Sequence, residues 1–315
     1  MPQIAVIIVS WNCKEELFRC FDSINRKKNP DIKIFVVDNA SEDGTKTECP
    51  NKYPHVRFLG QQQNLGFAKA NNIAWNADNA EFSIILNPDT VVLDDAIETL
   101  AGFMTAHPDC GLAAPLLLNE KNEIVESTFK FPSLWNYWTE HSILVVLLEK
   151  LGLQKNKPLS VEQTMQPARE IEWATGAAFI IRRDALEEQP LFDEQFFMYS
   201  EDADLCKRLA KKGWKRFLVP SAKVIHSHRA SSSKARARTI FHLFNSLFLY
   251  FKKHKGGISQ FFLRLSISMD MFARIIIIYL FCDTKNSKNG ERLKGYKNVL
   301  KALNPFFAKP IKKEI

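Results

Sequence analysis

The chain has 315 residues, enough for one large domain with or without an appendage, and its 46% hydrophobic content is ordinary for a folded protein. This composition excludes wholesale disorder and a collagen-like repeat. The net charge of +8 is uneven: Asp and Glu are frequent before about Asp109, and Lys and Arg dominate after Arg229. Such asymmetry suggests metal or substrate chemistry in the first part of the chain and an anionic partner for the later part, although a solvated basic surface is the better explanation for any single charge.

Strand and helix patterns alternate through the first third of the chain. Apolar runs predict buried strands at 4–9, 32–37, 56–59, 82–86 and 111–115, and apolar residues at helical spacing predict helices at 14–26, 67–79 and 94–107. This order is typical of a doubly wound α/β sheet with parallel strands, which binds ligands at the carboxyl ends of its strands. Asp38 and Asp89 each follow a strand, so we expect them on the same rim.

The rest of the chain is less regular. An irregular aromatic-rich stretch covers about 129–171. Beyond it we predict strands at 172–181, 214–219 and 223–226, helices at 201–212, 239–254 and 258–282, a basic loop at 229–238 and a basic tail.

Several features are missing from the sequence. The six cysteines have no paired spacing, which is typical of reduced core residues in a cytoplasmic protein. The first apolar run is too short for a signal peptide, and the uncharged run at 275–282 falls well below the ~20 residues that span a bilayer. The chain also lacks the glycine-rich dinucleotide and phosphate-loop motifs and the G-x-S-x-G nucleophile motif.

Six sequence blocks resemble, in order and spacing, the family 2 glycosyltransferases. They are VIIVSWN at 6–12, VVDNAS at 36–41, NLGFAKANN at 64–72, LNPD at 86–89, TGAAF at 175–179 followed by Arg182-Arg183, and FMYSEDADLC at 197–206. The Asn-Pro-Asp version is most similar to rhamnosyltransferase-like members. The resemblance covers residues 4 to about 228 and implies a GT-A fold, a nucleotide-sugar donor and inversion at the anomeric carbon.

The pattern and the resemblance together predict two parts. Residues 1–228 would form a GT-A nucleotide-sugar-binding and catalytic domain, a doubly wound mixed sheet flanked by helices, with an acceptor-side insertion at about 129–171. Residues 229–315 would form a mobile basic loop, a helical extension and a basic tail. Their Lys clusters and apolar run at 275–281 predict contact with an anionic membrane surface.

Residues that follow the first strands, most of them polar, form the predicted donor site. The resemblance implies that Asp38 accepts a hydrogen bond from the ring N–H of uracil or thymine, a role that suits a carboxylate; a turn carboxylate is the alternative. Gly66 permits close backbone approach, and the next helix N-terminus favours a diphosphate, although a capped loop explains the glycine almost as well. The predicted donor residues are Ser10, Asn12, Asp38, Asn39, Asn64, Gly66, Phe67, Ala68, Asn71, Asn87 and Asp89.

Asp89 and His226 are the predicted metal ligands. The resemblance places Asp89 in a motif that holds Mg²⁺ or Mn²⁺ against the diphosphate, because hard cations prefer carboxylate and phosphate oxygens. The first Asp of that motif is here Asn87, which carries no charge, so binding is expected to depend on the donor's own diphosphate. Only the resemblance separates His226 from a surface histidine, and a capping turn is the alternative for Asp89.

Asp202 is the predicted general base. The helix predicted at 201–212 has an apolar face set by Leu205, Cys206 and Leu209. Asp202 lies near the centre of that face, and the resemblance implies that it takes the acceptor hydroxyl's proton; a helix cap is the alternative. The predicted acceptor side is Trp173, Thr175, Gly176, Ala177 and Glu201.

The sequence features bear on four classes of function. The leading one is an inverting glycosyltransferase that moves a deoxysugar such as rhamnose from dTDP-rhamnose, or a hexose from a UDP-sugar, to a hydroxyl of a lipid-linked or polysaccharide acceptor in cell-envelope synthesis. A sugar-nucleotide nucleotidyltransferase would need a glycine-rich basic loop after the first strand, and a processive synthase would need spanning helices. A non-catalytic sugar-nucleotide-binding module would not need all the carboxylates. We expect a peripheral enzyme on the cytoplasmic membrane face, with no nucleic-acid partner.

Overall fold

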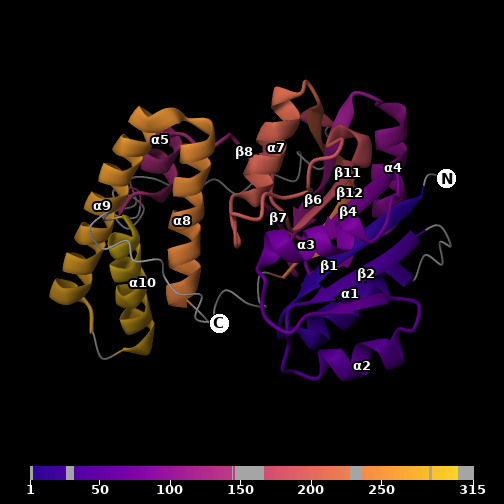
Figure 1. Cartoon of the computed structure of the whole chain (residues 1–315), viewed down its shortest axis with the longest axis horizontal. Helices are drawn as coiled ribbons and strands as arrows, with labels where there is room; N and C mark the ends of the chain where they lie inside the picture. The colour runs from indigo at the N-terminus through magenta and orange to yellow at the C-terminus, as the bar shows by residue number, and fades with distance from the viewer. Residues whose placement is uncertain are drawn as a thin grey trace. The chain divides into compact units, whose positions relative to one another are not determined.

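The computed structural model describes residues 3–25, 32–143, 145, 167–227, 236–283 and 286–303. These residues divide into two compact units (Figure 1). The α/β unit comprises the described parts of 1–131, 158–197 and 201–231, and the helical unit comprises those of 132–157, 198–200 and 232–315. The predicted domain boundary at 228 and most of the predicted basic loop lie outside the described residues.

One mixed sheet forms the centre of the α/β unit. Its strands are β1 (Ile4–Ser10), β2 (Ile32–Asp38), β3 (Arg57–Gly60), β4 (Phe82–Leu86), β5 (Thr90–Val92), β6 (Cys110–Leu118), β7 (Ile124–Val125), β9 (Arg169–Glu170), β11 (Ala178–Arg182) and β12 (Lys215–His226). The main order is β3-β2-β1-β4-β11-β6-β12-β5. The strands from β3 to β4 are parallel, whereas β11 is antiparallel to both of its neighbours. A separate pair joins β8 (Thr128–Phe129) to β10 (Trp173–Ala174).

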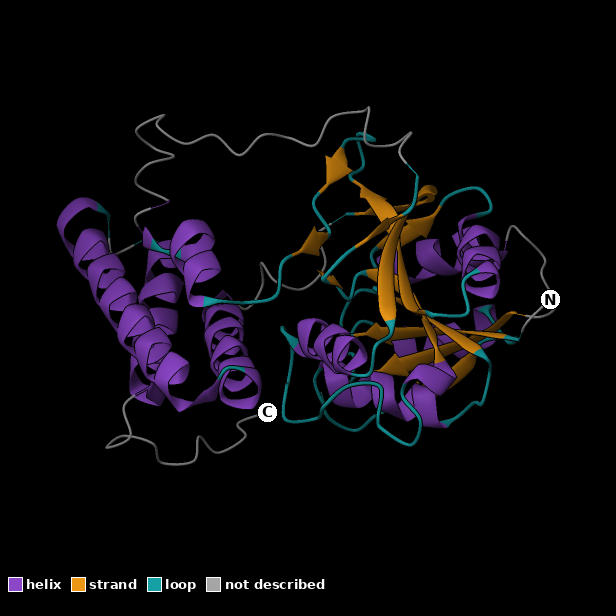
Figure 2. Cartoon of the chain, turned by 90° about the horizontal axis from the view of Figure 1, so that it is seen from above, coloured by secondary structure: helices purple, strands orange, loops and turns teal. Residues whose placement is uncertain are grey.

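Helices cover both faces of this sheet (Figure 2). They are α1 (Lys14–Asn25), α2 (Thr45–Lys52), α3 (Phe67–Asn76), α4 (Ala96–Ala106) and α7 (Glu201–Lys211), with a 3₁₀ turn, η3 (Arg183–Ala185). Residues of α1, α2 and α4 share one buried cluster with Val6 and Ile8 of β1. No residue of α3 belongs to that cluster, although α3 contacts β1 and β2, so α3 covers the opposite face.

The helical unit packs α8 (Arg236–His254), α9 (Gly256–Phe281) and α10 (Ser287–Leu303) against one another. The short α5 (Leu134–Asn136) and the π-helical turn η1 (Tyr137–His141) also belong to it. Its core includes Tyr250, Leu263, Ile267 and Met271, all fully buried. The segment Met198–Ser200 is part of this unit, and the Ser246 hydroxyl of α8 donates to the Met198 carbonyl at 2.8 Å.

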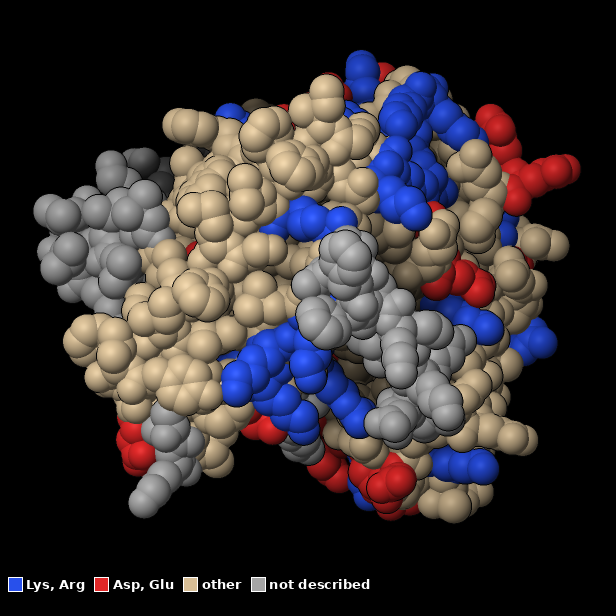
Figure 3. All heavy atoms as spheres, turned by 60° about the vertical axis from the view of Figure 1, so that its left-hand side comes forward, with Lys and Arg blue, Asp and Glu red and all other residues tan. Residues whose placement is uncertain are grey.

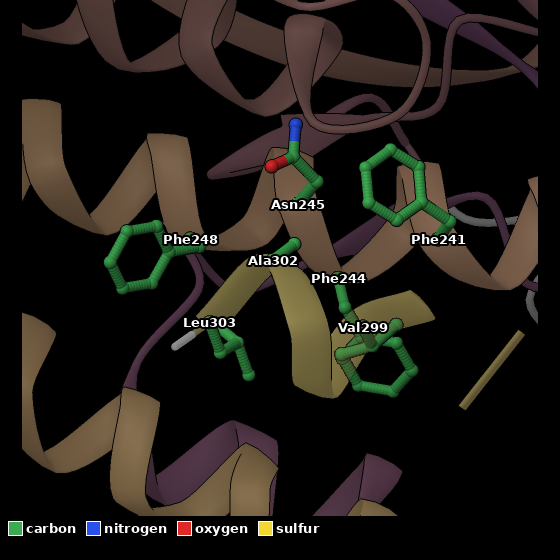
Figure 4. Close-up of a pocket in the computed structure, with 7 residues that line it drawn as sticks. All are labelled: Phe241, Phe244, Asn245, Phe248, Val299, Ala302 and Leu303. Carbon is green, nitrogen blue, oxygen red and sulfur yellow. The ribbon is translucent and has the colours of Figure 1, made fainter. Parts of the chain in front are cut away.

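A small cavity lies between α8 and α10 (Figure 4). Its volume is about 20 Å³, and it is lined by Phe241, Phe244, Asn245, Phe248, Val299, Ala302 and Leu303. This is room for no more than about one water molecule, so the cavity is a packing gap and not a ligand site. No helix within the described ranges is both long and apolar enough to cross a membrane.

Some predicted elements were wrong in detail. The strand predicted at 172–181 is two short strands, because residues 175–177 turn between β10 and β11. The strands predicted at 214–219 and 223–226 are one strand, β12, with an irregularity between Val219 and Lys223. Residues 236–238 were predicted as loop but form the start of α8. The six cysteines were predicted in the core, and the described ones are buried except Cys282, which follows α9 and is exposed.

Besides the short α5, the helices α2 and α10 were not predicted. The sequence of α2 is polar and contains Pro50, so it has little apolar periodicity. The predicted basic tail contains α10, whose buried residues Leu293, Val299 and Leu303 are spaced among lysines. In both helices tertiary packing, and not the local pattern, determines the structure.

A buried ion pair fixes α7 to the α/β unit. The Asp204 carboxylate has no exposed surface, and the Arg208 guanidinium donates to it at 3.0 Å. The same guanidinium donates to the Leu191 and Pro190 carbonyls. The pair therefore joins the helix to the segment that precedes it.

We expect Arg208→Ala to lower the free energy of unfolding by about 3 kcal/mol, because it leaves the buried Asp204 carboxylate without this cation. Urea unfolding followed by circular dichroism measures the change. Arg19→Ala is the matched control, since Arg19 is exposed and lies 3.9 Å from Glu16; its expected loss is below about 1 kcal/mol. Equal losses in the two variants would contradict the role of the Asp204 pair.

Candidate functional site

The predicted rim exists at the carboxyl ends of β1, β2 and β4. Ser10 at the end of β1 pairs with Asp38 at the end of β2, and both are fully buried. Asp38 Oδ2 accepts the Ser41 N–H at 3.0 Å. Its Oδ1 is buried and accepts no hydrogen bond from the described part of the chain. Burial raises the pKa of this carboxyl, so Asp38 presents one unused acceptor that is covered in this structure.

Three asparagines of the predicted donor site hold loops together. The Asn39 amide accepts the Leu65 N–H at 3.2 Å and donates to the Gly66 carbonyl at 3.1 Å. Asn64 Oδ1 accepts the Gly66 N–H at 2.9 Å, and Asn12 Oδ1 accepts the Glu42 N–H at 2.8 Å. Side chains assigned to ligand binding from sequence thus position the loops that border the site.

Gly66 brings the loop before α3 against the segment before α7. Its φ of 83° and ψ of 179° lie in a region that is essentially restricted to glycine. A Cβ there would lie 2.4 Å from the Phe197 carbonyl oxygen, which also accepts the Phe67 N–H at 2.7 Å. In the first turns of α3, Ala68 and Asn71 are buried, and Asn71 Oδ1 accepts no hydrogen bond from a described residue.

The Asn87-Pro88-Asp89 turn meets the end of β12. Asp89 Oδ1 lies 3.2 Å from His226 Nε2, and the Asn87 amide lies 3.4 Å from the same nitrogen. Strand β5 determines this approach, because Thr90 pairs with His226. Asp89 and His226 are 8% and 7% exposed. The structure therefore brings the predicted metal residues together.

The chemistry of these donors fits a divalent cation. A carboxylate, an imidazole nitrogen and an amide are typical ligands of hard or borderline metal ions. Within the described ranges, no three His, Cys, Asp or Glu side chains converge as a metal cluster. The residues present would supply only part of a coordination shell, and diphosphate oxygens or water would complete it.

Asp202 and Glu201 begin α7 in contrasting environments. Asp202 Oδ2 accepts the Gly176 N–H at 2.9 Å, and its Oδ1 accepts the Ala203 N–H at 2.8 Å. Burial raises the Asp202 pKa to about 6. Burial, and then the charge of Asp202, raise the Glu201 pKa well above its ordinary value. Both carboxyls therefore hold a proton to higher pH than exposed carboxyls do, and Asp202 accepts a proton more readily than an exposed aspartate.

The turn at 175–177 connects these groups. The Asn87 N–H donates to the Ala177 carbonyl at 2.9 Å, and the Thr175 N–H donates to Ser127. A Cβ on Gly176 would lie 3.3 Å from the Phe67 ring and 3.8 Å from Asp202 Oδ2. Residues of the loop before α3, the Asn87-Pro88-Asp89 turn and α7 thus adjoin this one backbone segment.

Trp173 lies on the β8–β10 pair. Its ring stacks on Phe129 with the centroids 4.8 Å apart, and its indole N–H donates to the Lys130 carbonyl at 2.8 Å. One face of the indole is therefore covered by this contact, and the side chain remains partly exposed.

Sequence reasoning missed the Phe197 carbonyl and the backbone that follows it. Tyr199 and Ser200 have φ values of 69° and 62°, which are unusual for residues other than glycine. A backbone carbonyl has no sequence signature, and neither residue type signals a left-handed conformation. The Asp204–Arg208 pair could have been found from its spacing of four residues.

The comparisons with known proteins agree with this architecture. Residues 5–189, more than half of the chain, match the model of the family "Glycosyl transferase family 2". The chain is 29% identical over 245 residues to an N-acetylglucosaminyl-diphospho-decaprenol L-rhamnosyltransferase of Mycobacterium tuberculosis, covering 73% of this chain and 77% of that protein. It is 25% identical over 244 residues to the rhamnosyltransferase WbbL of Escherichia coli, covering 74% of this chain and 88% of that protein.

Two solved structures have a similar fold. The mannosyltransferase PcManGT from Pyrobaculum calidifontis, in complex with GDP-Man and Mn²⁺, has a TM-score of 0.54 at 16% identity and covers 95% of this chain and 85% of its own. GalNAc-T7 with UDP, GalNAc and Mn²⁺ has a TM-score of 0.57 at 15% identity and covers 96% of this chain and 56% of its own. The predicted GT-A type mixed sheet with flanking and C-terminal helices is confirmed.

We expect Gly66→Ala to lower the free energy of unfolding by about 2 kcal/mol, because the new Cβ meets the Phe197 carbonyl in a backbone conformation restricted to glycine. Gly102→Ala is the matched control, since Gly102 lies inside α4 with no heavy atom within 4 Å of the added carbon; it should raise stability by about 0.5 kcal/mol. Thermal and urea unfolding measure both. A neutral Gly66→Ala would refute the close approach of the two loops.

Proposed function

This chain belongs to glycosyl transferase family 2 and is a glycosyltransferase, and we propose that it is an inverting enzyme of cell-envelope glycan synthesis. The proposed donor is dTDP-rhamnose or a related dTDP- or UDP-sugar, and the proposed acceptor is a hydroxyl of a lipid-linked or polysaccharide glycan. Support comes from the two rhamnosyltransferase relatives, one of which has a lipid diphosphate in its name. The predicted family and class of activity are confirmed by the family match.

The environment of Asp202 is the main support for the proposed mechanism. Two backbone N–H groups hold its carboxylate in place beside Gly176, and burial makes it a stronger base than an exposed aspartate. We propose that the acceptor hydroxyl binds against this carboxylate. As the hydroxyl oxygen bonds to the anomeric carbon, Asp202 takes the hydroxyl proton. The nucleoside diphosphate leaves from the opposite face of the sugar, which inverts the configuration.

Asp89 and His226, with Asn87, are the proposed holders of Mg²⁺ or Mn²⁺. When bound, such a cation supplies positive charge that stabilises the leaving diphosphate. Because only Asp89 contributes a formal negative charge, we propose that the cation binds together with the donor. The two structural neighbours are complexes that contain Mn²⁺ and a nucleotide or nucleotide-sugar.

The remaining donor contacts are proposed at the ends of β1 and β2 and at the N-terminus of α3. Asp38 Oδ1 is the proposed acceptor for the N–H of the base, and it must become uncovered on binding because it is fully buried here. The N-terminal amides of α3, beginning at Phe67, favour an anion. We further propose that the enzyme works as a peripheral protein on the cytoplasmic membrane face, where it would reach a lipid-linked acceptor.

We expect Asp202→Asn to lower kcat by about 10²–10⁴-fold while donor binding persists, because the amide cannot accept the acceptor's proton. Wild-type kcat/KM should rise with pH through about 6 and level off above it, since the carboxylate must lose its proton to act. Glu201→Gln is the comparison variant, because it changes the adjacent carboxyl of α7 and leaves Asp202 in place. Near-normal sugar transfer by Asp202→Asn, together with loss of sugar transfer in Glu201→Gln, would identify Glu201 as the general base instead.

We expect Asp89→Ala to weaken Mn²⁺-dependent binding of the donor by at least about tenfold, because the metal loses its charged protein ligand. Calorimetric titration of nucleoside diphosphates and nucleotide-sugars, with and without Mn²⁺, measures this and also identifies the donor. Asp109→Ala is the control, since Asp109 is an exposed carboxylate paired with Lys215. Unchanged metal dependence in Asp89→Ala would refute the assignment.

A further inference from the structure

The outward side of α9 is a continuous row of large apolar side chains. Its regular members are Ile258, Phe262, Leu265, Met269, Phe272 and Ile276, which are 40–78% exposed. Their spacing alternates between four and three residues, so they follow one side of the helix. We call this row the α9 apolar face. Monomeric soluble proteins rarely leave so large an apolar patch in water.

The charged residues of α9 are all engaged elsewhere. Asp270 is buried, accepts Arg274 Nε at 2.8 Å and also accepts the Ile143 N–H. The Arg264 guanidinium lies over the Phe248 ring of α8, 5.2 Å from its centroid. The sequence of α9 has no other charged residue. The α9 apolar face is therefore free of charge along its length, while the opposite side packs against the helical unit.

Cations lie near both ends of this face. Residues 236–303 contain thirteen Lys and Arg but only three Asp and Glu. Lys252 and Lys253 are exposed in the last turn of α8, next to the start of α9. Near the other end, Lys297 Nζ of α10 donates to the Tyr279 hydroxyl at 3.0 Å. Figure 3 brings the side of α9 forward and shows there a broad surface of residues other than Lys, Arg, Asp and Glu.

We propose that the α9 apolar face docks on an anionic lipid bilayer, with α9 lying in the plane of the interface. An apolar helical face bordered by Lys and Arg is the pattern of helices that bind there, and cations beside it are attracted to anionic headgroups. This inference deepens the proposed function and rests on its lipid-linked acceptor. Docking would confine enzyme and acceptor to one surface and so raise their effective concentration.

A second copy of the chain fits this face less well. Self-association would bring two strongly basic helical units together with few acidic side chains to offset their repulsion. Insertion across the bilayer is a poor fit as well, because α9 does not reach the apolar length that spanning requires. Charge complementarity therefore selects the anionic membrane surface.

Vesicle co-sedimentation of the full-length protein tests the proposal. We expect binding to phosphatidylcholine vesicles that contain phosphatidylglycerol, weaker binding to phosphatidylcholine alone, and loss of the difference at high salt. The double variant Phe262→Glu with Phe272→Glu should bind the anionic vesicles at least about tenfold more weakly, which corresponds to 1.4 kcal/mol. The matched control is Leu243→Glu, an equivalent change at an exposed leucine of α8, which should bind as wild type.

Measurements of folding and of nucleotide-sugar binding distinguish a loss of membrane binding from a loss of structure. Both altered side chains are exposed, so the melting temperature and the nucleotide-sugar calorimetry of the double variant should match wild type; if that variant does not fold, Met269→Glu replaces it. Lys252→Glu with Lys253→Glu should reduce binding to anionic vesicles only.

Three outcomes would overturn the proposal. The first is a wild-type protein that stays in the supernatant with anionic vesicles. The second is a double variant that binds like wild type. The third is a stable wild-type dimer by light scattering, made monomeric by the double variant, without vesicle binding. Vesicle binding by a protein that takes no nucleotide-sugar would instead refute the proposed function alone.

Discussion

The antiparallel pairing of β11 with β4 determines where chemistry can occur in the α/β unit. Because β11 lies between β4 and β6, the chain entering it passes the turn that leaves β4. The Ala177 carbonyl accepts the Asn87 backbone N–H, and the neighbouring Gly176 N–H donates to the Asp202 carboxylate. The Asn87-Pro88-Asp89 turn and α7 are therefore both anchored to one short stretch of backbone, and an all-parallel sheet would not place that stretch there.

Burial of carboxylates is the cost of this arrangement. Desolvation raises the pKa of Asp38, Glu201 and Asp202 alike, which means that the fold disfavours their charged forms. Proteins tolerate such groups where they act and stabilise the structure around them. Here loop-bridging asparagines and the buried Asp204–Arg208 pair supply that support. The polar residues of the candidate site thus divide into groups proposed to contact ligands and groups that hold the loops.

The sequence predicts most of the α/β unit because its strands are continuous apolar runs and its carboxylates follow them directly. It also predicts that Asp89, His226 and Asp202 serve one site, although only through family resemblance. It does not predict α2 or α10, whose helical periodicity is interrupted by proline or hidden among lysines. Nor does it reveal that Asn39 and Asn64 bind backbone, because a side chain's partner depends on which loops meet in the fold.

The segment Met198–Ser200 has a consequence for how this protein can be divided. The chain leaves the α/β unit after Phe197, joins the helical unit for three residues, and returns at Glu201. Within that interval Ser246 binds Met198, and two residues adopt left-handed backbone. The helical unit is therefore no detachable C-terminal module. A recombination event or truncation near residue 231 would separate the segment leading into α7 from the bundle that holds this segment, so both units must be exchanged together.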